Sequence, residues 1–344
     1  MARVVVIGAG VAGLEAAGQL NRLGFDVTVA ERENETGGNL RHWYHLFPDR
    51  RSGREVMDYL KNHTSGKNIK ILTGTEITNI RAGEGKFFLS TVAGPAIEAD
   101  AVIIATGFDL FDSRRKEEYG YGIYENVITS ADLEKMFSKG EIILADGRVP
   151  ERVGFIHCVG SRDEKAGNLY CSKLCCVTAV KQAMELHEKR EGVKTFCFYM
   201  DMRMGGAYYE ELYREAQEKY GVTFIRGKVS EISVNINNRL VVKAEDTLAG
   251  RPLRMELDMV VLMAGMVMSQ GGRMLAENAS MECGENRFFK PADNHYGNNL
   301  SHIPGIFYAG ACTAPMNITE SISHARSAVN EVLGYLNNHK PANE

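Results

Sequence analysis

A glycine-rich hexapeptide near the start of the chain restricts the possible folds more than any other part of the sequence. Gly8-Ala9-Gly10-Val11-Ala12-Gly13 stands between Arg3–Ile7, which reads as a strand, and Leu14–Leu23, which reads as a helix closed by Gly24. In such a setting the first glycine permits a tight turn, the second lets the backbone approach a pyrophosphate, and the third lets helix and strand pack closely. The phosphates then rest on the helix N-terminus, where free N–H groups favour an anion. The pattern predicts a Rossmann-like dinucleotide site.

An acidic residue completes this predicted site. Phe25–Glu31 reads as the next strand, so that strand, glycine turn, helix and strand form a βαβ opening. Glu31 ends the second strand, where its carboxylate can accept hydrogen bonds from a ribose diol.

Three later segments favour FAD over NAD as the dinucleotide. Gly37-Gly38 follows the second strand closely, Ala105-Thr106-Gly107 follows the apolar strand Val102–Ile104, and Tyr308-Ala309-Gly310-Ala311 follows the last apolar strand. Each segment resembles a glycine signature of the flavoproteins that contain two dinucleotide-binding domains.

The third signature departs from the usual pattern at one position. In those flavoproteins an aspartate that binds the ribityl chain usually follows the glycine, whereas this chain has Ala311 there. The helix that starts near Thr319 is expected to direct its N-terminus at the flavin, where its dipole stabilises negative charge on the reduced ring. The residues that we expect to contact FAD are Gly8, Gly10, Val11, Ala12, Gly13, Glu31, Arg32, Gly38, Asn39, Leu40, Ile77, Ala105, Thr106, Gly107, Gly310, Ala311 and Thr319.

The 344 residues suffice for two domains with separate cores. We expect segments 1–110 and 285–344 to form an FAD-binding domain, and residues 111–284 to form a second domain that resembles an NAD(P)-binding domain. The first strand of the second domain, Val153–Cys158, runs into Val159-Gly160-Ser161-Arg162-Asp163, which has one glycine instead of three. Direct hydride transfer from NAD(P)H is therefore not expected there. The sequence also has no Cys-x-x-Cys pair, which argues against a thiol–disulfide reductase.

Four of the seven cysteines fall within nineteen residues, in the order Cys158-x12-Cys171-x3-Cys175-Cys176. Cys158 ends the predicted strand, and Cys171 and Cys175 lie four residues apart at the start of a predicted helix, 171–191, and hence on one face. Thiolates that converge at a strand end and a helix N-terminus suit an iron–sulfur cluster, because the helix dipole stabilises a negative cofactor. Structural zinc usually takes paired Cys-x2–4-Cys knuckles, which vicinal cysteines fit poorly. Zinc and simple buried thiols stay open as alternatives.

The same region resembles a known family. The segments that carry the resemblance are Cys158-Val159-Gly160-Ser161-Arg162-Asp163, Tyr170-Cys171-Ser172-Lys173-Leu174-Cys175-Cys176 and Lys181-Gln182-Ala183, and the family is that of the heterodisulfide reductase A subunits (HdrA-like). The resemblance implies an α/β fold of the thioredoxin-reductase-like, two-dinucleotide-binding-domain type. A Rossmann-like FAD domain is then followed by a second α/β domain with a [4Fe–4S] cluster on Cys158, Cys171, Cys175 and Cys176. A homodimer and complexes with iron–sulfur subunits of the B and C type are also implied.

Lys181 lies on the same predicted helix as Cys176 and is a candidate flavin neighbour, with a solvated lysine as the alternative. The chain lacks the Cys-x2-Cys-x2-Cys-x3-Cys-Pro runs of the ferredoxin modules in full-length methanogen members. It therefore resembles the short form found in heterodisulfide-reductase-like complexes of sulfur oxidisers. The electron bifurcation of the methanogen members is not expected for this chain. We expect an oxidoreductase subunit that transfers electrons between FAD, the cluster and partner subunits in sulfur oxidation. The alternatives are a stand-alone pyridine-nucleotide-dependent flavin oxidoreductase and a non-catalytic scaffold.

Charge and hydropathy limit the partners and the cellular location that can be expected for this chain. The net charge is −4 and no basic block is present, so no nucleic-acid partner is expected. The longest apolar run, Met259–Met268, is too short to span a bilayer and reads as a buried strand. The N-terminal segment reads as a first strand rather than a signal peptide. A cytoplasmic location is therefore expected.

Overall fold

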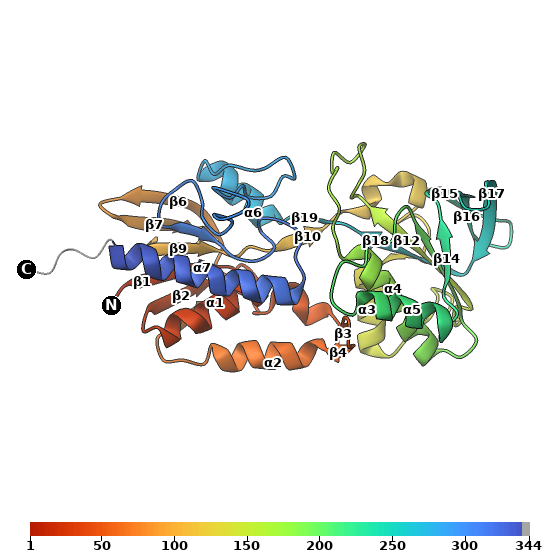
Figure 1. Ribbon diagram of the computed structural model, residues 1–344, viewed down its shortest axis with the longest axis horizontal. Coiled ribbons are helices and arrows are strands. Elements are labelled where there is room, and N and C mark those ends of the chain that lie inside the picture. The colour runs from red at the N-terminus through yellow and green to blue at the C-terminus, as the bar shows by residue number, and fades with distance from the viewer. Residues whose placement is uncertain (339–344) are drawn as a thin grey trace, which may run out of the picture. The chain divides into compact units, whose positions relative to one another are not determined.

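The computed structural model describes residues 1–338, and the chain forms two compact units (Figure 1). Of the described residues, unit 1 consists of Met1–Arg41, Arg54–Asp109 and residues 267–338, and unit 2 consists of His42–Gly53 and Leu110–Met266. These bounds differ from the predicted domains in three places, because residues 267–284 lie in unit 1, whereas residues 42–53 and residue 110 lie in unit 2. The last six residues of the predicted FAD-binding domain, 339–344, lie outside the described residues.

Unit 1 is built on a five-stranded parallel sheet in the order β20-β9-β1-β2-β5. Its strands are β1 (Arg3–Ile7), β2 (Asp26–Ala30), β5 (Ile69–Leu72), β9 (Ala101–Ile104) and β20 (Ile306–Tyr308). Strands β9 and β20 are buried at every residue, as expected for parallel strands covered on both faces. Helices α1 (Val11–Arg22) and α7 (Ile318–Asn338) pack against each other beside this sheet (Figure 1).

Helix α1 packs closely because its buried face is made of small residues, among them Ala12, Gly13, Ala16 and Ala17. It ends before Gly24, whose φ of +86° is a left-handed value that suits glycine after a helix. Unit 1 also contains an antiparallel sheet and two further helices. These elements are β6 (Ile77–Gly83), β7 (Lys86–Thr91), β8 (Ile97–Ala99), α2 (Gly53–His63) and α6 (Gln270–Asn278).

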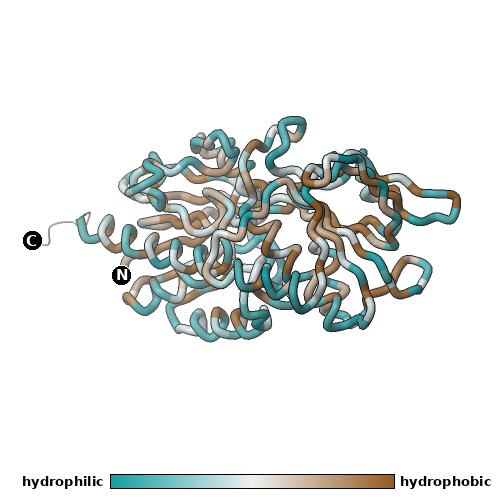
Figure 2. The backbone as a smooth tube through the Cα atoms, turned by 45° about the vertical axis from the view of Figure 1, so that its right-hand side comes forward, coloured by the Kyte–Doolittle hydropathy of each residue, from teal (hydrophilic) through white to brown (hydrophobic). Residues whose placement is uncertain are grey.

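Unit 2 repeats the parallel architecture with the strand order β11-β18-β12-β13-β14. These strands are β11 (Val127–Thr129), β12 (Arg152–Val159), β13 (Lys194–Tyr199), β14 (Thr223–Arg226) and β18 (Met259–Ala264). The helices are α3 (Ser130–Lys139), α4 (Cys175–Lys189) and α5 (Tyr209–Glu218), and an antiparallel sheet contains β15 (Val229–Val234), β16 (Leu240–Asp246) and β17 (Arg251–Leu257). Residues 42–53 add the short pair β3 (His45–Leu46) and β4 (Arg51–Ser52). Apolar stretches follow the strands in both units (Figure 2).

Two sequence predictions need correction here. The run Met259–Met268 is two strands, β18 and β19 (Met266–Met268), separated at Gly265. A Cβ at Gly265 would lie 2.9 Å from the side chains of both Ser161 and Ser172, so the chain needs glycine there. Helix α4 begins at Cys175 and not at Cys171, because Lys173 has a left-handed φ of +58° that interrupts the helix.

Three 3₁₀ turns and one strand complete the description. They are η1 (Gly38–His42), η2 (Ser113–Arg115), η3 (Glu117–Tyr119) and β10 (Phe108–Leu110). Within residues 1–338, none of the helices has the length and apolar character that crossing a membrane requires.

Candidate cofactor sites

The carboxyl ends of the parallel strands bring the predicted FAD motifs of unit 1 to one edge of the sheet. In the strand register, Ile7 pairs with both Ala30 and Ile104, and Ile104 pairs with Tyr308. The next residues along the chain are Gly8, Glu31, Ala105 and Ala309, which therefore lie in one row. Crevices outside the carboxyl ends of parallel strands are where ligands bind in open α/β sheets.

The three fingerprint glycines have the three different surroundings that a pyrophosphate site requires. Gly8 has a φ of +103°, and a Cβ there would lie 2.5 Å from the carbonyl oxygen of Ala105. A Cβ on Gly13 would overlap the carbonyl oxygen of Gly8, so the start of α1 can approach the turn only with glycine. A Cβ on Gly10 would meet nothing within 4 Å, which leaves that side of the backbone open. Gly10 is also the N-cap of α1 and provides no side-chain cap, so the first N–H groups of the helix are available to an anion.

Glu31 is held against the glycine turn. One carboxylate oxygen accepts a hydrogen bond from the N–H of Ala9 at 2.7 Å, and the other accepts one from the N–H of Glu33 at 2.9 Å. Gly37 donates its N–H to the carbonyl oxygen of Ala9 at 2.7 Å, and a Cβ on Gly38 would lie 3.2 Å from the Cα of Gly10. The predicted acid and the second glycine pair thus pack directly on the fingerprint.

Several other residues that we expect to contact FAD also lie in unit 1. The Arg32 guanidinium lies 3.6 Å from the Asp109 carboxylate, and the Asn39 amide donates to the carbonyl oxygen of Phe108 at 3.0 Å. Leu40 and Ile77 are buried core residues with 3% and 5% exposure. Val11 and Ala12 start helix α1.

The start of α6 joins this region, which the sequence analysis did not anticipate. A Cβ on Gly272 would lie 2.9 Å from the hydroxyl of Thr106, and the N–H of Gln270 donates to the Asp109 carboxylate at 2.7 Å. The buried hydroxyl of Thr106 has no hydrogen-bond partner within residues 1–338. Gly107, with a φ of +63°, has open space at its Cβ position. The paired glycines at 271 and 272 were a sequence signal for this close approach.

At the third signature, the N–H of Gly310 donates to Nδ1 of the buried His324 at 2.9 Å. Ala311 is buried, and Thr319 lies in the first turn of α7. The N-terminus of α7 is closed by a reciprocal cap. The Asn317 side chain accepts from the N–H of Glu320 at 2.8 Å, and the Glu320 carboxylate accepts from the N–H of Asn317 at 2.9 Å.

In unit 2 the four clustered cysteines occupy the carboxyl end of β12, the following loop and the first turn of α4. Cys158 lies where the register of β12 shifts, and has a left-handed φ of +59°. Cys175 and Cys176 are buried, whereas Cys158 and Cys171 are half-buried. No group of three His, Cys, Asp or Glu side chains in the described part of the chain has metal-binding geometry.

The thiols nevertheless lie close enough to affect one another electrostatically. Burial, together with the neighbouring Cys176 and Cys171, raises the pKa of Cys158 to about 11. Burial also raises the pKa of Cys175, to which Cys158, Cys176 and Cys171 contribute. The four sulfurs therefore form one electrostatic group, and the raised pKa values of Cys158, Cys175 and Cys176 favour their thiol forms at neutral pH without a metal. Because a metal takes the thiolate form, binding of a cluster at this group would release protons.

Hydrogen-bond donors surround these sulfurs, as the fit of an anionic cluster requires. The N–H of Lys173 donates to Cys171 at 3.3 Å, and the backbone N–H of Arg203 hydrogen-bonds Cys176. The Arg162 guanidinium lowers the pKa of Cys158 through its charge and through hydrogen bonding. Donors aimed at sulfur are a feature of iron–sulfur sites, where they stabilise the net negative cluster.

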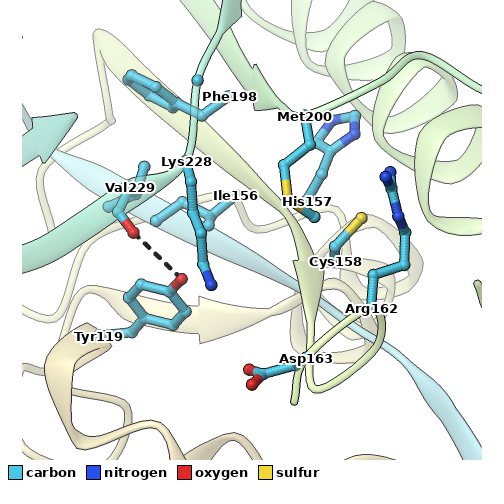
Figure 3. Close-up of a pocket in the computed structure, with 11 residues that line it drawn as sticks. Tyr119, Ile156, His157, Cys158, Arg162, Asp163, Phe198, Met200, Lys228 and Val229 are labelled. Atoms are coloured by element: carbon cyan, nitrogen blue, oxygen red, sulfur yellow. Dashed lines mark hydrogen bonds between the residues drawn. The ribbon is translucent and has the colours of Figure 1, made fainter. Parts of the chain in front are cut away.

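A recess beside Cys158 is lined by further polar side-chain atoms that lack hydrogen-bond partners (Figure 3). Both ring nitrogens of the buried His157 and Nη1 of Arg162 are without a hydrogen-bond partner within residues 1–338. Burial lowers the pKa of His157 to about 4, so the ring is neutral. Buried polar atoms without partners are uncommon and indicate a missing water or ligand. The chemistry of this donor set, four clustered thiols with N–H groups and an arginine beside them, is of the kind that an iron–sulfur cluster takes.

Lys181 is buried in unit 2, with 2% of its side chain exposed, so the alternative of a solvated lysine is wrong. Its ammonium donates to the carboxylate of Glu134 at 2.5 Å and to the carbonyl oxygen of His45 at 2.8 Å. It also lies 3.4 Å from the carboxylate of Glu185. The second oxygen of Glu134 accepts the N–H of Tyr44 at 2.8 Å, which ties residues 42–53 to α3 and α4. The predicted flavin contact of Lys181 stays a prediction.

Comparison with known proteins defines the class first. Residues 2–139 match the family model of pyridine nucleotide-disulphide oxidoreductases. Thioredoxin reductase from T. acidophilum has a TM-score of 0.68 at 19% identity, covering 99% of this chain and 100% of that chain. Thioredoxin reductase from Lactococcus lactis has a TM-score of 0.69 at 16% identity, covering 98% and 100%. The predicted thioredoxin-reductase-like fold of the two-domain flavin oxidoreductases is therefore confirmed.

Within that class, A subunits of heterodisulfide reductases are similar to this chain in sequence. The second of the iron–sulfur A subunits of Methanopyrus kandleri CoB–CoM heterodisulfide reductase is 30% identical over 95% of this chain and 63% of its own length. The A subunit of the Methanosarcina mazei ferredoxin:CoB-CoM heterodisulfide reductase is 31% identical over 97% and 53%. The A subunit of the H2:CoB-CoM heterodisulfide,ferredoxin reductase of Methanothermobacter thermautotrophicus is 39% identical over 67% of this chain and 36% of its own length. The chain is thus a homologue of the heterodisulfide reductase A subunits, as the cysteine motif predicts, and spans less than two thirds of the length of these relatives.

Proposed function

We propose that this chain is an FAD- and [4Fe–4S]-containing electron-transfer subunit of a heterodisulfide-reductase-like complex. The observation that carries the proposal is the gathering of four thiols and their donors in unit 2, in a chain whose unit 1 has the glycine-lined edge of a dinucleotide site. The homology to the heterodisulfide reductase A subunits supports the same assignment.

In unit 1, the proposed FAD-binding domain, the N-terminus of α1 binds the pyrophosphate over the open side of Gly10. Glu31, fixed by the N–H groups of Ala9 and Glu33, accepts hydrogen bonds from the ribose of the adenosine half. Thr106 supplies a buried hydroxyl that is still without a partner among the described residues. FAD, once bound, supplies the exchange between two-electron and one-electron chemistry.

In unit 2, Cys158, Cys171, Cys175 and Cys176 hold the cluster, which supplies one-electron transfer. The Lys173 and Arg203 N–H groups and the Arg162 guanidinium stabilise the negative charge on the sulfurs. The proposed setting is a homodimer that works with iron–sulfur subunits of the B and C type in the cytoplasm, in the oxidation of sulfur compounds. The homology to A subunits of heterodisulfide reductases supports a role within such a complex.

The alternative, a pyridine-nucleotide-dependent flavin oxidoreductase, receives less support from unit 2. The turn after β12 has Gly160 where a fingerprint would start, and a Cβ there would overlap the ring of Phe111. The Asn168 amide donates to the carbonyl oxygen of Gly160 at 2.9 Å. The turn is therefore packed with protein groups where a pyrophosphate needs open backbone.

Replacement of single cysteines tests the proposal. In anaerobically purified protein, Cys175→Ser is expected to lose most of the iron and acid-labile sulfide and to retain FAD. The matched control is Cys197→Ser, because Cys197 is also buried, in β13 of the same unit, but is not a proposed ligand. Unchanged iron content in Cys175→Ser, or equal loss in both variants, would contradict the ligand assignment.

A further inference from the structure

We propose that Arg162, which is paired with Asp201, makes the four-thiolate site of unit 2 easier to reduce through its positive charge. This inference rests on the proposed function, since it concerns the cluster assigned to Cys158, Cys171, Cys175 and Cys176. It adds a residue pair that sets the redox potential of that site.

The backbone around Arg162 is fixed before its side chain makes any contact. Arg162 has a left-handed φ of +51°, and its N–H donates to the carbonyl oxygen of Tyr170 at 2.9 Å. The neighbouring Asp163 exchanges backbone hydrogen bonds with Asn168 at 2.9 and 3.0 Å. A non-glycine residue in the left-handed region is uncommon, so this turn holds the arginine in a direction that the surrounding structure determines.

The far end of the side chain is fixed as well. Nη2 of Arg162 donates to the Asp201 carboxylate at 2.7 Å, and only 22% of the arginine side chain is exposed. Asp201 follows β13, and its own carbonyl oxygen lies 3.8 Å from the sulfur of Cys176. The guanidinium is thus held between the carboxylate of Asp201 and the thiol of Cys158, beside the recess in Figure 3.

This cation acts on three of the four thiols. Its charge lowers the pKa values of Cys158 and Cys176, while Cys158 and Cys171 in turn raise the pKa of Arg162. Arg203 is a second cation near Cys176. Arginine keeps its charge at any pH the protein meets, so its influence does not titrate away.

The direction of the effect follows from the charge balance. One-electron reduction, by dithionite in a titration or by reduced flavin in the protein, adds one negative charge to the four-thiolate site and needs no bond to form or break at Arg162. A fixed positive charge close by stabilises the more negative, reduced form, and so raises the redox potential. The Asp201 carboxylate offsets part of that positive charge, so its removal must act in the opposite direction from removal of the arginine.

The test is a set of four variants in a reductive titration of the anaerobically purified protein, followed by electron paramagnetic resonance. Arg162→Gln is expected to shift the midpoint potential of the cluster to a more negative value, and Asp201→Asn to a more positive value. Arg162→Lys keeps the charge and is expected to shift it less than Arg162→Gln does. Arg226→Gln is the matched control, because Arg226 lies 3.8 Å from the same Asp201 carboxylate and is an exposed residue. It is expected to leave the midpoint close to that of the parent.

The outcomes separate this inference from the proposed function. A parent protein without iron and acid-labile sulfide contradicts the proposed function. If the parent contains a cluster, the inference is overturned when Arg162→Gln and Asp201→Asn both leave the midpoint potential unchanged, or when both shift it in the same direction. The proposed function stays intact in either case. If Arg162→Gln fails to retain iron, Asp201→Asn decides, since a positive shift supports the inference and an unchanged midpoint overturns it.

Discussion

Replacing Lys181 by methionine should destabilise unit 2 severely. Methionine fills similar space but leaves the Glu134 carboxylate, 1% exposed, without its cation. Two unit charges 2.5 Å apart attract by about 7 kcal/mol at an effective dielectric constant of about 20. Desolvation offsets part of this attraction, and removing one partner of a buried pair typically costs about 3–5 kcal/mol. Since whole domains are stable by only about 5–15 kcal/mol, the loss is a large fraction of the total.

The chain offers a specific probe for this loss. Trp43 is the single tryptophan, and the adjacent Tyr44 donates its N–H to Glu134. Urea-induced unfolding followed by tryptophan fluorescence should therefore show a much lower midpoint for Lys181→Met. Lys189→Met on the same helix removes an exposed lysine that contacts the Tyr44 hydroxyl, and should cost less than about 1 kcal/mol.

Neutralising Glu134, the acid that Lys181→Met leaves without its cation, provides a second test. Glu134→Gln in the Lys181→Met background should recover part of the loss, because the uncompensated charge is then gone. A Lys181→Met protein that unfolds at the same urea concentration as the Lys189→Met control would refute the reasoning. So would a double variant less stable than Lys181→Met.

Two further predictions concern the neighbouring acid and the glycine turn. Burial and the nearby Glu134 raise the pKa of Glu185 to about 7, against the opposing effect of Lys181. The stability that Glu185 contributes is therefore present below about pH 4.5 and lost as the pH rises through about 7, by about 3 kcal/mol. Glu185→Gln should remove this slope in urea unfolding between pH 5 and 8, and a slope equal to that of the parent would contradict the assignment. Gly13→Ala should abolish FAD retention on gel filtration, because the added Cβ overlaps the carbonyl oxygen of Gly8, whereas Gly334→Ala in open space should retain it; equal FAD content in both would contradict the glycine's role.

The sequence predicted best what is local. The turn at Gly8–Gly13 and the strands around it follow from adjacent residues, and the structure has them at the predicted places. The homology to the heterodisulfide reductase A subunits could be predicted for the same reason, because the cysteine motif is short and local in the sequence. The start of α4 was misplaced by four residues, because a left-handed Lys173 cannot be read from residue type.

What depended on distant partners could not be read from the sequence. The environment of Lys181 is decided by Glu134, which lies 47 residues earlier, and by the backbone of His45, which lies 136 residues earlier. The attachment of residues 42–53 to unit 2 follows from these same long-range contacts. The approach of α6 to Thr106 likewise joins segments that are far apart in the chain.

The central claim, that unit 1 holds a flavin and the four thiols of unit 2 hold one cluster, is tested most directly by composition. Anaerobically purified protein should be assayed for flavin, iron and acid-labile sulfide per chain. The account predicts about one FAD with about four iron and about four sulfide atoms per chain. A yellow protein that contains FAD but neither iron nor acid-labile sulfide would contradict it.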